Sequence, residues 1–85
     1  MKHFASSDFW NNYNKLPKPI RELADKNFEI LKENQNYPSL HFKNTGKYKS
    51  IRIGIHYRAL AIEIPERLLW FWIGNHSEYD KIIKK

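Results

Sequence analysis

Residues 50–80 read SIRIGIHYRALAIEIPERLLWFWIGNHSEYD, and this stretch decides the fold. Three runs rich in isoleucine, leucine and aromatic residues are separated by short breaks at His56 and at Pro65 and Glu66. Apolar runs bounded by turn residues are typical of strands in a sheet with at least one covered face. Cations and titratable groups are costly inside such a core. We therefore expect four polar residues to stand on the open side of the sheet: Arg52, Arg58, His76 and Tyr79.

The spacing of apolar residues predicts three strands within this stretch. Ile51, Ile53 and Ile55 alternate with polar or small residues, which predicts a strand with its isoleucines against the helices and Arg52 on the opposite face. Residues 57–64 and 68–73 are nearly apolar throughout, as central strands are. Gly74 and Asn75 then end the last strand, and residues 76–84 are expected to form a short helix.

Two helices are expected upstream of the sheet. Ser6 or Ser7 followed by Asp8 indicates a helix start, because a hydroxyl caps free N–H groups and an acid suits the positive end of the helix dipole. Pro17 and Pro19 separate this helix from the next, since proline is tolerated in a first turn. The second helix is predicted from one apolar stripe with a charged, solvated face opposite: Ile20, Leu23, Ala24, Phe28 and Leu31.

The remaining segments complete an α+β domain. Residues 34–36 and Pro38 end the second helix, residues 40–43 are a short strand candidate, and residues 44–46 have turn chemistry. Residues 1–5 are too short and mixed to assign. We expect one domain over residues 1–85, in which two N-terminal helices pack on a four-stranded, mostly antiparallel sheet followed by a short C-terminal helix.

The composition limits the class of protein. The chain has 85 residues, of which 41% are hydrophobic and 15% aromatic, so large side chains can build a core. Cysteine is absent from the sequence, which excludes disulfides and thiolate metal sites and fits a reducing cytoplasm. The longest apolar run, residues 68–73, is too short to cross a bilayer, and the first ten residues lack the apolar core of a signal peptide. We therefore expect a soluble cytoplasmic protein without a membrane partner.

The positive charge is concentrated in one part of the chain. The formal net charge is +6, and no acid occurs between Glu33 and Glu63. A local basic surface favours polyanions, nucleic acid first among them, although solubility alone is the plainer interpretation. Five cations fall in this interval: Lys43, Lys47, Lys49, Arg52 and Arg58.

Several segments together resemble the RelE/ParE superfamily, the small bacterial toxins of type II toxin–antitoxin pairs. The likeness is carried by the two N-terminal helices with LPKPIREL, by SLHFK and SIRIGIHYRALAIEI, and by LWFWIGNHSEYDKI. Its most specific parts are the Tyr57–Arg58 pair and the Gly-x-His-x-x-Tyr-Asp ending at residues 74–80. The chain departs from the family pattern at residues 1–6, where the usual first strand is barely present, and at Ser50, where RelE proper has lysine.

The resemblance implies a toxin with one of two activities. RelE-like members are ribosome-dependent endoribonucleases (mRNA interferases) that cut messenger RNA and so inhibit translation, whereas ParE-like members poison DNA gyrase. Matched to the nuclease branch, Arg52 and Arg58 correspond to cations of the middle strands, and His76 and Tyr79 correspond to the C-terminal catalytic pair. This hydrolase activity is our leading hypothesis, and a gyrase poison or a degenerate member that only binds antitoxin is the alternative. Either branch implies a cognate antitoxin protein, with which the chain would form a hetero-oligomer.

The expected chemistry needs neither metal nor cofactor. RNA carries its own nucleophile, the 2′-hydroxyl, so the protein must supply a base, a cation for the phosphate and an acid for the 5′-oxygen. His76 suits the base or acid because imidazole titrates near neutral pH, and the two arginines suit the phosphate. Tyr79 is expected to stack on a base or donate a proton. Lys43, Lys47 and Lys49 are expected to hold the RNA backbone.

Structural interpretations of the same residues stay open at this point. Arg58 could be an ordinary surface residue, His76 a helix cap and Tyr79 a packing residue. His56 falls at an expected turn and His41 beside a phenylalanine, so both favour a structural role over catalysis. His76 and Asp80 have the i, i+4 spacing of a metal pair, but two ligands without a third indicate a metal site only weakly.

Overall fold

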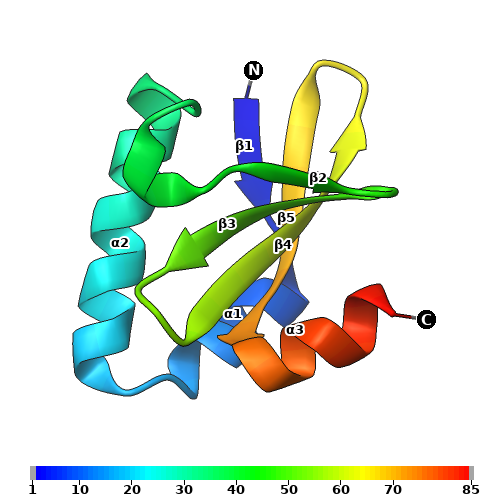
Figure 1. Ribbon diagram of the computed structural model, residues 1–85. Coiled ribbons are helices and arrows are strands. Elements are labelled where there is room, and N and C mark those ends of the chain that lie inside the picture. The colour runs from blue at the N-terminus through cyan, green and yellow to red at the C-terminus, as the bar shows by residue number, and fades with distance from the viewer. Residues whose placement is uncertain (1, 85) are drawn as a thin grey trace.

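The computed structural model describes residues 2–84, so residues 1 and 85 of the expected domain lie outside the described residues. A five-stranded sheet forms the centre, with strand order β1-β5-β4-β3-β2. Strand β1 runs parallel to β5, and the other neighbours are antiparallel. Along the chain (Figure 1) the elements are β1 (Lys2–Ala5), α1 (Ser7–Asn14), α2 (Lys18–Glu33), the 3-10 helix η1 (Pro38–Leu40), β2 (Lys43–Thr45), β3 (Tyr48–Ile53), β4 (Tyr57–Ile64), β5 (Arg67–Asn75) and α3 (His76–Ile83).

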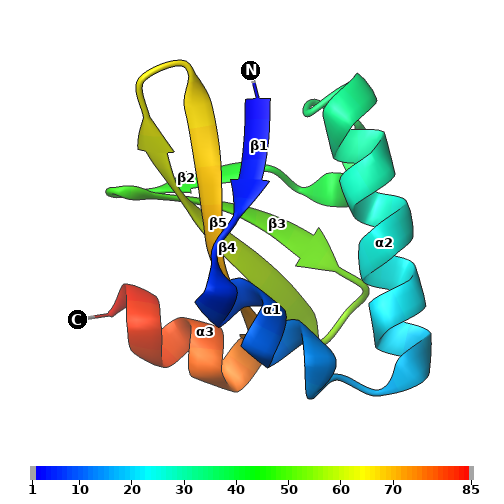
Figure 2. The same cartoon turned by 180° about the vertical axis from the view of Figure 1, so that it is seen from behind.

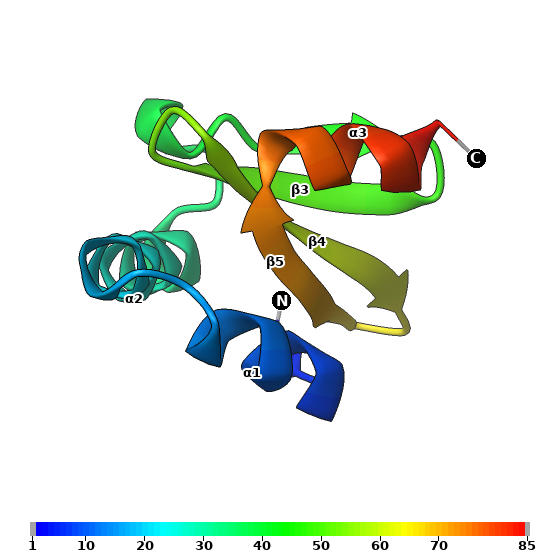
Figure 3. The same ribbon diagram turned by 90° about the horizontal axis from the view of Figure 1, so that it is seen from below.

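Helices cover both faces of the sheet. Figure 2 shows α1 and α2 on one side, and Figure 3 shows α3 lying across the other side, above β3 and β4. The face toward α1 and α2, here the helix-pair face, carries the main core, in which Ile51, Ala59 and Trp70 are almost wholly buried. The face toward α3, here the α3 face, carries a smaller cluster of Leu60, Trp72 and Tyr79. The α+β class expected from the sequence is confirmed.

The N-terminal helices begin where local chemistry predicts. Ser6 caps α1, and its Oγ accepts a hydrogen bond from the backbone N–H of Phe9 at 3.2 Å. Pro17 precedes α2, whose last turn ends where the N–H of Asn34 donates to the carbonyl of Ile30. The apolar stripe of α2 also contains a polar residue, Asn27, that is only 6% exposed.

The strand count differs from the prediction by one, because β1 was not recognised in residues 1–5. A four-residue strand is too short to show an alternating pattern, and it becomes recognisable only through its pairing with β5. Lys2 to Ala5 pair in parallel register with Arg67 to Trp70, and the N–H of Ser6 donates to the carbonyl of Trp70 at 2.9 Å.

The strand expected over residues 40–43 is wrong in its position. Pro38 starts a 3-10 turn through Leu40, and His41 follows in the left-handed region with φ 46°. A turn suits this place because proline fixes φ and has no N–H for a strand ladder. The strand therefore begins at Lys43 and includes residues 44 and 45, and the turn comes only at Gly46.

Ile55 does not pack against the helices, contrary to the alternation of its neighbours. Strand β3 ends at Ile53, and Gly54 turns the chain with φ +65°. Ile55 at the turn is 70% exposed. The alternation of side chains between the two faces therefore ends at Gly54, where the glycine changes the direction of the backbone.

An extra residue in β5 distributes its two tryptophans between the faces. Leu60 pairs with Trp72 while the next residue of β4, Ala61, pairs with Trp70, so Phe71 has no partner and forms a bulge. Trp70 consequently belongs to the helix-pair core and Trp72 to the cluster under α3. Strict alternation would have placed both rings on one face.

Candidate functional site

Two arginines stand side by side on the α3 face of the sheet. Arg52 of β3 and Arg58 of β4 are directly opposite in the antiparallel register. Residues opposite each other have Cβ atoms about 4.5–5.5 Å apart and project to the same face. The neighbours Ile51, Ile53 and Ala59 face the helix-pair core, which places the arginines on the α3 face.

Arg58 is buried with part of its guanidinium unsatisfied. The residue is 6% exposed, and its guanidinium carbon lies 5.1 Å from the centre of the Tyr79 ring. Neither Nε nor Nη1 of Arg58 has a hydrogen-bond partner among the described residues. A buried cation with free donors is costly unless an anion engages it, because the lost hydration is not replaced. The surface interpretation of Arg58 therefore does not describe this residue.

Arg52 is held by its own turn and by a histidine. Its Nε donates to the carbonyl of Gly54 at 2.9 Å, and its Nη1 lies 3.3 Å from Nε2 of His41. From below, the Nδ2 of Asn27 donates to the carbonyl of Arg52 at 2.9 Å. Neither His41 nor Asn27 was expected at the site from the sequence. Their contacts span 11 and 25 residues, respectively, and depend on the turn after Leu40 and on helix packing.

His76 begins α3 at the edge of the arginine pair. Its backbone N–H donates to the carbonyl of His56 at 2.7 Å, which joins the β3–β4 turn to the start of the helix. The helix cap is Asn75, whose Oδ1 accepts from the N–H of Glu78 at 2.9 Å, so His76 is not needed as the cap. The His76 side chain is 49% exposed, with Nδ1 3.3 Å from Oδ2 of Asp80.

Tyr79 joins the histidine to the buried arginine. Its ring centre lies 5.4 Å from that of His76, and its face is covered by the guanidinium of Arg58. The residue is 4% exposed and packs with Leu60 and Trp72. A nucleobase could stack on this ring only if Arg58 moved, so in this structure Tyr79 supports the arginine. The four predicted residues thus form one continuous row: Arg52, Arg58, Tyr79 and His76.

The three lysines are spread over different surroundings. Lys43 pairs with Ser50 across β2 and β3, which places it on the arginine face. Lys47 lies in the turn after β2, and its Nζ is 5.4 Å from the Tyr48 ring centre. Lys49 alternates with Ser50 and so points to the helix-pair side, where its Nζ is 3.3 Å from Glu63. Lys43 and Lys47 are therefore better placed than Lys49 to meet a ligand of the arginines.

The described part of the chain provides little for a metal ion. Among residues 2–84, no group of three or more His, Cys, Asp or Glu side chains is placed to hold one. The His76–Asp80 pair supplies two ligands only.

Among the helices described in residues 2–84, none is long and apolar enough to cross a membrane.

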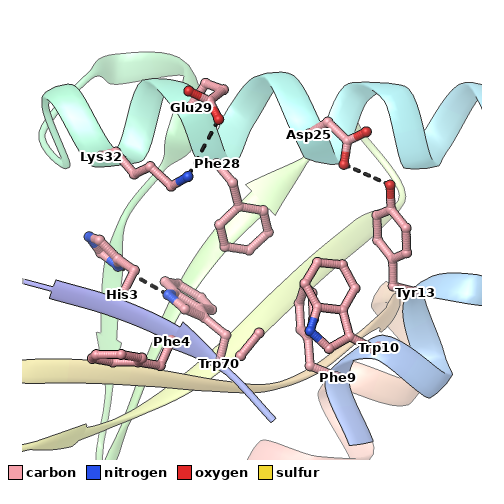
Figure 4. Close-up of a pocket in the computed structure, with 11 residues that line it drawn as sticks. His3, Phe4, Phe9, Trp10, Tyr13, Asp25, Phe28, Glu29, Lys32 and Trp70 are labelled. Carbon is pink, nitrogen blue, oxygen red and sulfur yellow. Dashed lines mark hydrogen bonds and ion pairs between the residues drawn. The ribbon is translucent and has the colours of Figure 1, made fainter. Parts of the chain in front are cut away.

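A groove lies on the helix-pair side, on the face of the sheet opposite to the arginines, and its polar groups are paired internally. Figure 4 shows this groove of about 340 Å³, with the aromatic rings of Phe9, Phe28 and Trp70 around it. The Nε1 of Trp70 donates to Nδ1 of His3 at 3.1 Å, and burial lowers the pKa of His3, as do nearby positive charges. The Tyr13 hydroxyl donates to Oδ1 of Asp25 at 2.7 Å, and this hydrogen bond raises the pKa of Tyr13.

Solved structures with the same architecture are bacterial and archaeal toxins. The YoeB/ParE toxin from Agrobacterium tumefaciens has a TM-score of 0.68 at 16% identity, over 89% of this chain and 99% of that chain. The RelB–RelE antitoxin–toxin complex from Methanococcus jannaschii gives 0.67 at 21% identity, over 92% and 96%. The isolated RelE toxin of E. coli gives 0.64 at 16% identity, over 98% and 95%. At these identities the likeness shows the fold.

A match of the amino-acid sequence assigns the chain to a family. No curated protein matches the chain, whereas the model of the ParE-like toxin domain matches residues 18–81. This match begins at α2 and includes the arginine pair and most of α3. Because it covers well over half of the chain, the protein belongs to the ParE-like toxin domain family and is a toxin of the RelE/ParE superfamily.

Proposed function

We propose that this toxin is a ribosome-dependent endoribonuclease that cleaves messenger RNA. The observation that carries the proposal is the buried guanidinium of Arg58, which has two free donors, a second guanidinium opposite it in the sheet and a histidine nearby. A doubly charged donor pair suits a phosphodiester, because each guanidinium stays charged and can contact two oxygens.

The proposed reaction is an internal attack on phosphorus. The 2′-hydroxyl of the RNA loses its proton to Nε2 of His76 and forms a bond to phosphorus, while the bond from phosphorus to the 5′-oxygen breaks. The products are a 2′,3′-cyclic phosphate and a 5′-hydroxyl, which takes up one proton. Arg58 and Arg52 stabilise the negative charge that gathers on the phosphate in the transition state.

His41 is a candidate for the acid of this reaction through its Nδ1, because its Nε2 faces the guanidinium of Arg52, which can only donate. The reaction needs one group that accepts a proton and another that supplies one. His76 and His41 lie near Arg58 and Arg52, respectively, so each arginine has a histidine beside it. Tyr79 acts in this scheme by holding Arg58 and bordering His76. Lys43 and Lys47, which both lie toward the β2–β3 turn, would attract the backbone of the RNA chain beside the cut.

An antitoxin partner is the second part of the proposal. One of the similar structures is an antitoxin–toxin complex, and a chain with net charge +6 suits an acidic partner. We propose that the neighbouring gene encodes an acidic, partly disordered protein that folds over this surface and blocks it. Co-expression should give a stable complex without cleavage activity, while an unaffected toxin would count against this partner.

A pulse of expression in bacteria, followed by sequencing of RNA ends, tests the nuclease. New ends inside translated codons are expected within minutes, carrying 5′-hydroxyls and cyclic phosphates. Arg58→Ala and His76→Ala should each abolish the ends while the purified variants keep a cooperative unfolding transition. Lys26→Ala, on the exposed face of α2, is the matched loss of one positive charge and should cut as the parent does.

The same experiment separates the competing function, which the ParE-like description of the matching family favours. A gyrase poison would leave messenger RNA intact, inhibit supercoiling and cause double-strand breaks. A degenerate member that only binds antitoxin would change neither RNA nor DNA nor growth. Either of these results from the parent protein would refute the nuclease.

A further inference from the structure

We infer that Asp80 is a positioning residue that orients the imidazole of His76 and leaves its Nε2 free to accept a proton. The catalytic part of this inference rests on the proposed nuclease function. Sequence spacing alone indicated only a weak metal pair for these two residues. The structure gives the pair a different use, because only one nitrogen of the ring faces the carboxylate.

The position of the carboxylate follows from the helix. His76 and Asp80 are four residues apart on α3 and therefore lie on one face of it. Nδ1 of the ring is 3.3 Å from Oδ2, and the two side chains are 49% and 40% exposed. The pair is thus open enough for a ligand to reach the ring from the solvent side.

Other contacts fix the rest of His76. Its N–H is bound to the carbonyl of His56 at 2.7 Å, and Asn75 caps the helix at the preceding residue. The ring of Tyr79, itself packed under Arg58, lies beside the imidazole at 5.4 Å. With the backbone and one side of the ring fixed, the imidazole can still rotate. The carboxylate of Asp80 then decides which ring nitrogen faces it and which one stays free.

This orientation determines where the proton of the neutral ring resides. An ionised carboxylate only accepts hydrogen bonds, so it favours the tautomer with hydrogen on Nδ1. Nε2 then presents a lone pair to the solvent side, where it can take the 2′-hydroxyl proton. An ordinary surface ion pair would support the helix without selecting a tautomer that the reaction uses.

Nitrogen chemical shifts of the ring test the orientation without any RNA. In the parent protein at a pH where His76 is neutral, we expect the Nδ1–H form to dominate. Asp80→Ala should shift the population toward the Nε2–H form, and Asp80→Glu should restore part of it. Glu78→Ala removes an acid from the same turns of α3 without touching the His76 ring contacts described above, so it should leave the population unchanged. Unchanged tautomers in Asp80→Ala would overturn the inference.

Cleavage kinetics on programmed ribosomes test the consequence. Asp80→Ala should lower kcat by about tenfold to a hundredfold, part of the ~10²–10⁴-fold effect of a positioned acid–base group, and leave KM close to that of the parent. Asp80→Glu should recover part of the loss, and Glu78→Ala should show none. A normal kcat in Asp80→Ala would refute the catalytic role. If the parent cuts no RNA at all, the proposed function fails, and the tautomer measurement still decides the orientation.

Discussion

Replacing Arg58 by methionine should stabilise the protein while abolishing its activity. The guanidinium is 6% exposed and leaves two nitrogens without partners among the described residues. Buried donors without partners cost about 1–3 kcal/mol. Against this, the contact of Arg58 with the Tyr79 ring contributes about 0.5–2 kcal/mol, which methionine would replace only in part. Apolar replacement of buried ionic groups is often neutral or stabilising by ~1–4 kcal/mol.

The sum favours a gain of about 1 kcal/mol in the free energy of unfolding. For a domain of this size, such a gain raises Tm by about 4–8 °C. Urea unfolding should show a higher midpoint with an unchanged m-value, and RNA cleavage should fall to background. Arg52→Met is the matched control, because Arg52 donates to the carbonyl of Gly54 and contacts His41. It should lose about 0.5–1.5 kcal/mol for a satisfied hydrogen bond. A clear loss of stability in Arg58→Met would show that its guanidinium is satisfied in the free protein.

Three further predictions concern the support of the sheet. Burial lowers the pKa of His3, so as the pH drops the unfolded chain takes up a proton on this residue before the folded chain does. The free energy of unfolding should therefore fall as the pH drops through about 6.5. His3→Gln, whose side-chain oxygen can still accept from Trp70, should lessen the accompanying fall in Tm. Asn27→Ala removes the donor to the Arg52 carbonyl and should cost about 1–3 kcal/mol in urea unfolding, with a similar variant at an exposed α2 residue costing little. Gly54→Ala should reduce both Tm and RNA cleavage, because its φ of +65° and a side chain of α2 at 2.9 Å leave no strain-free place for a methyl group; an unchanged Tm would refute this.

The sequence predicted those parts of the fold that repeat a local pattern. Strand β4 occupies residues 57–64, as expected, because its apolar run is long and ends at Pro65. The start of α1 followed from the Ser6 cap, and the end of α2 from the polar residues after Glu33. Strand β1 escaped prediction because it depends on a partner distant in sequence. The turn at His41 is local, since it follows from Pro38, and the expected strand there overlooked that proline.

The candidate site was predictable as a set of residues and not as an arrangement. Alternation placed Arg52 opposite the isoleucines, and the antiparallel hairpin then brought Arg58 beside it. The burial of Arg58 and Tyr79 could not be foreseen, because it results from α3 folding back over the sheet. The contacts of His41 and Asn27 with Arg52 have no signal in their neighbouring residues, which is why the sequence indicated only structural roles or none.

The bulge at Phe71 has a consequence for how the chain can vary in length. The residues between Trp70 and Gly74 set the parity of β5, and Gly74 pairs with Arg58. Deleting Phe71 would remove only the unpaired residue, because Ala61 already pairs with Trp70 and Leu60 with Trp72. Neighbouring residues of a regular strand point to opposite faces, so both rings and the start of α3 would keep their sides of the sheet. Loss of the Phe71 codon should therefore leave the arrangement of Arg58, Tyr79 and His76 intact.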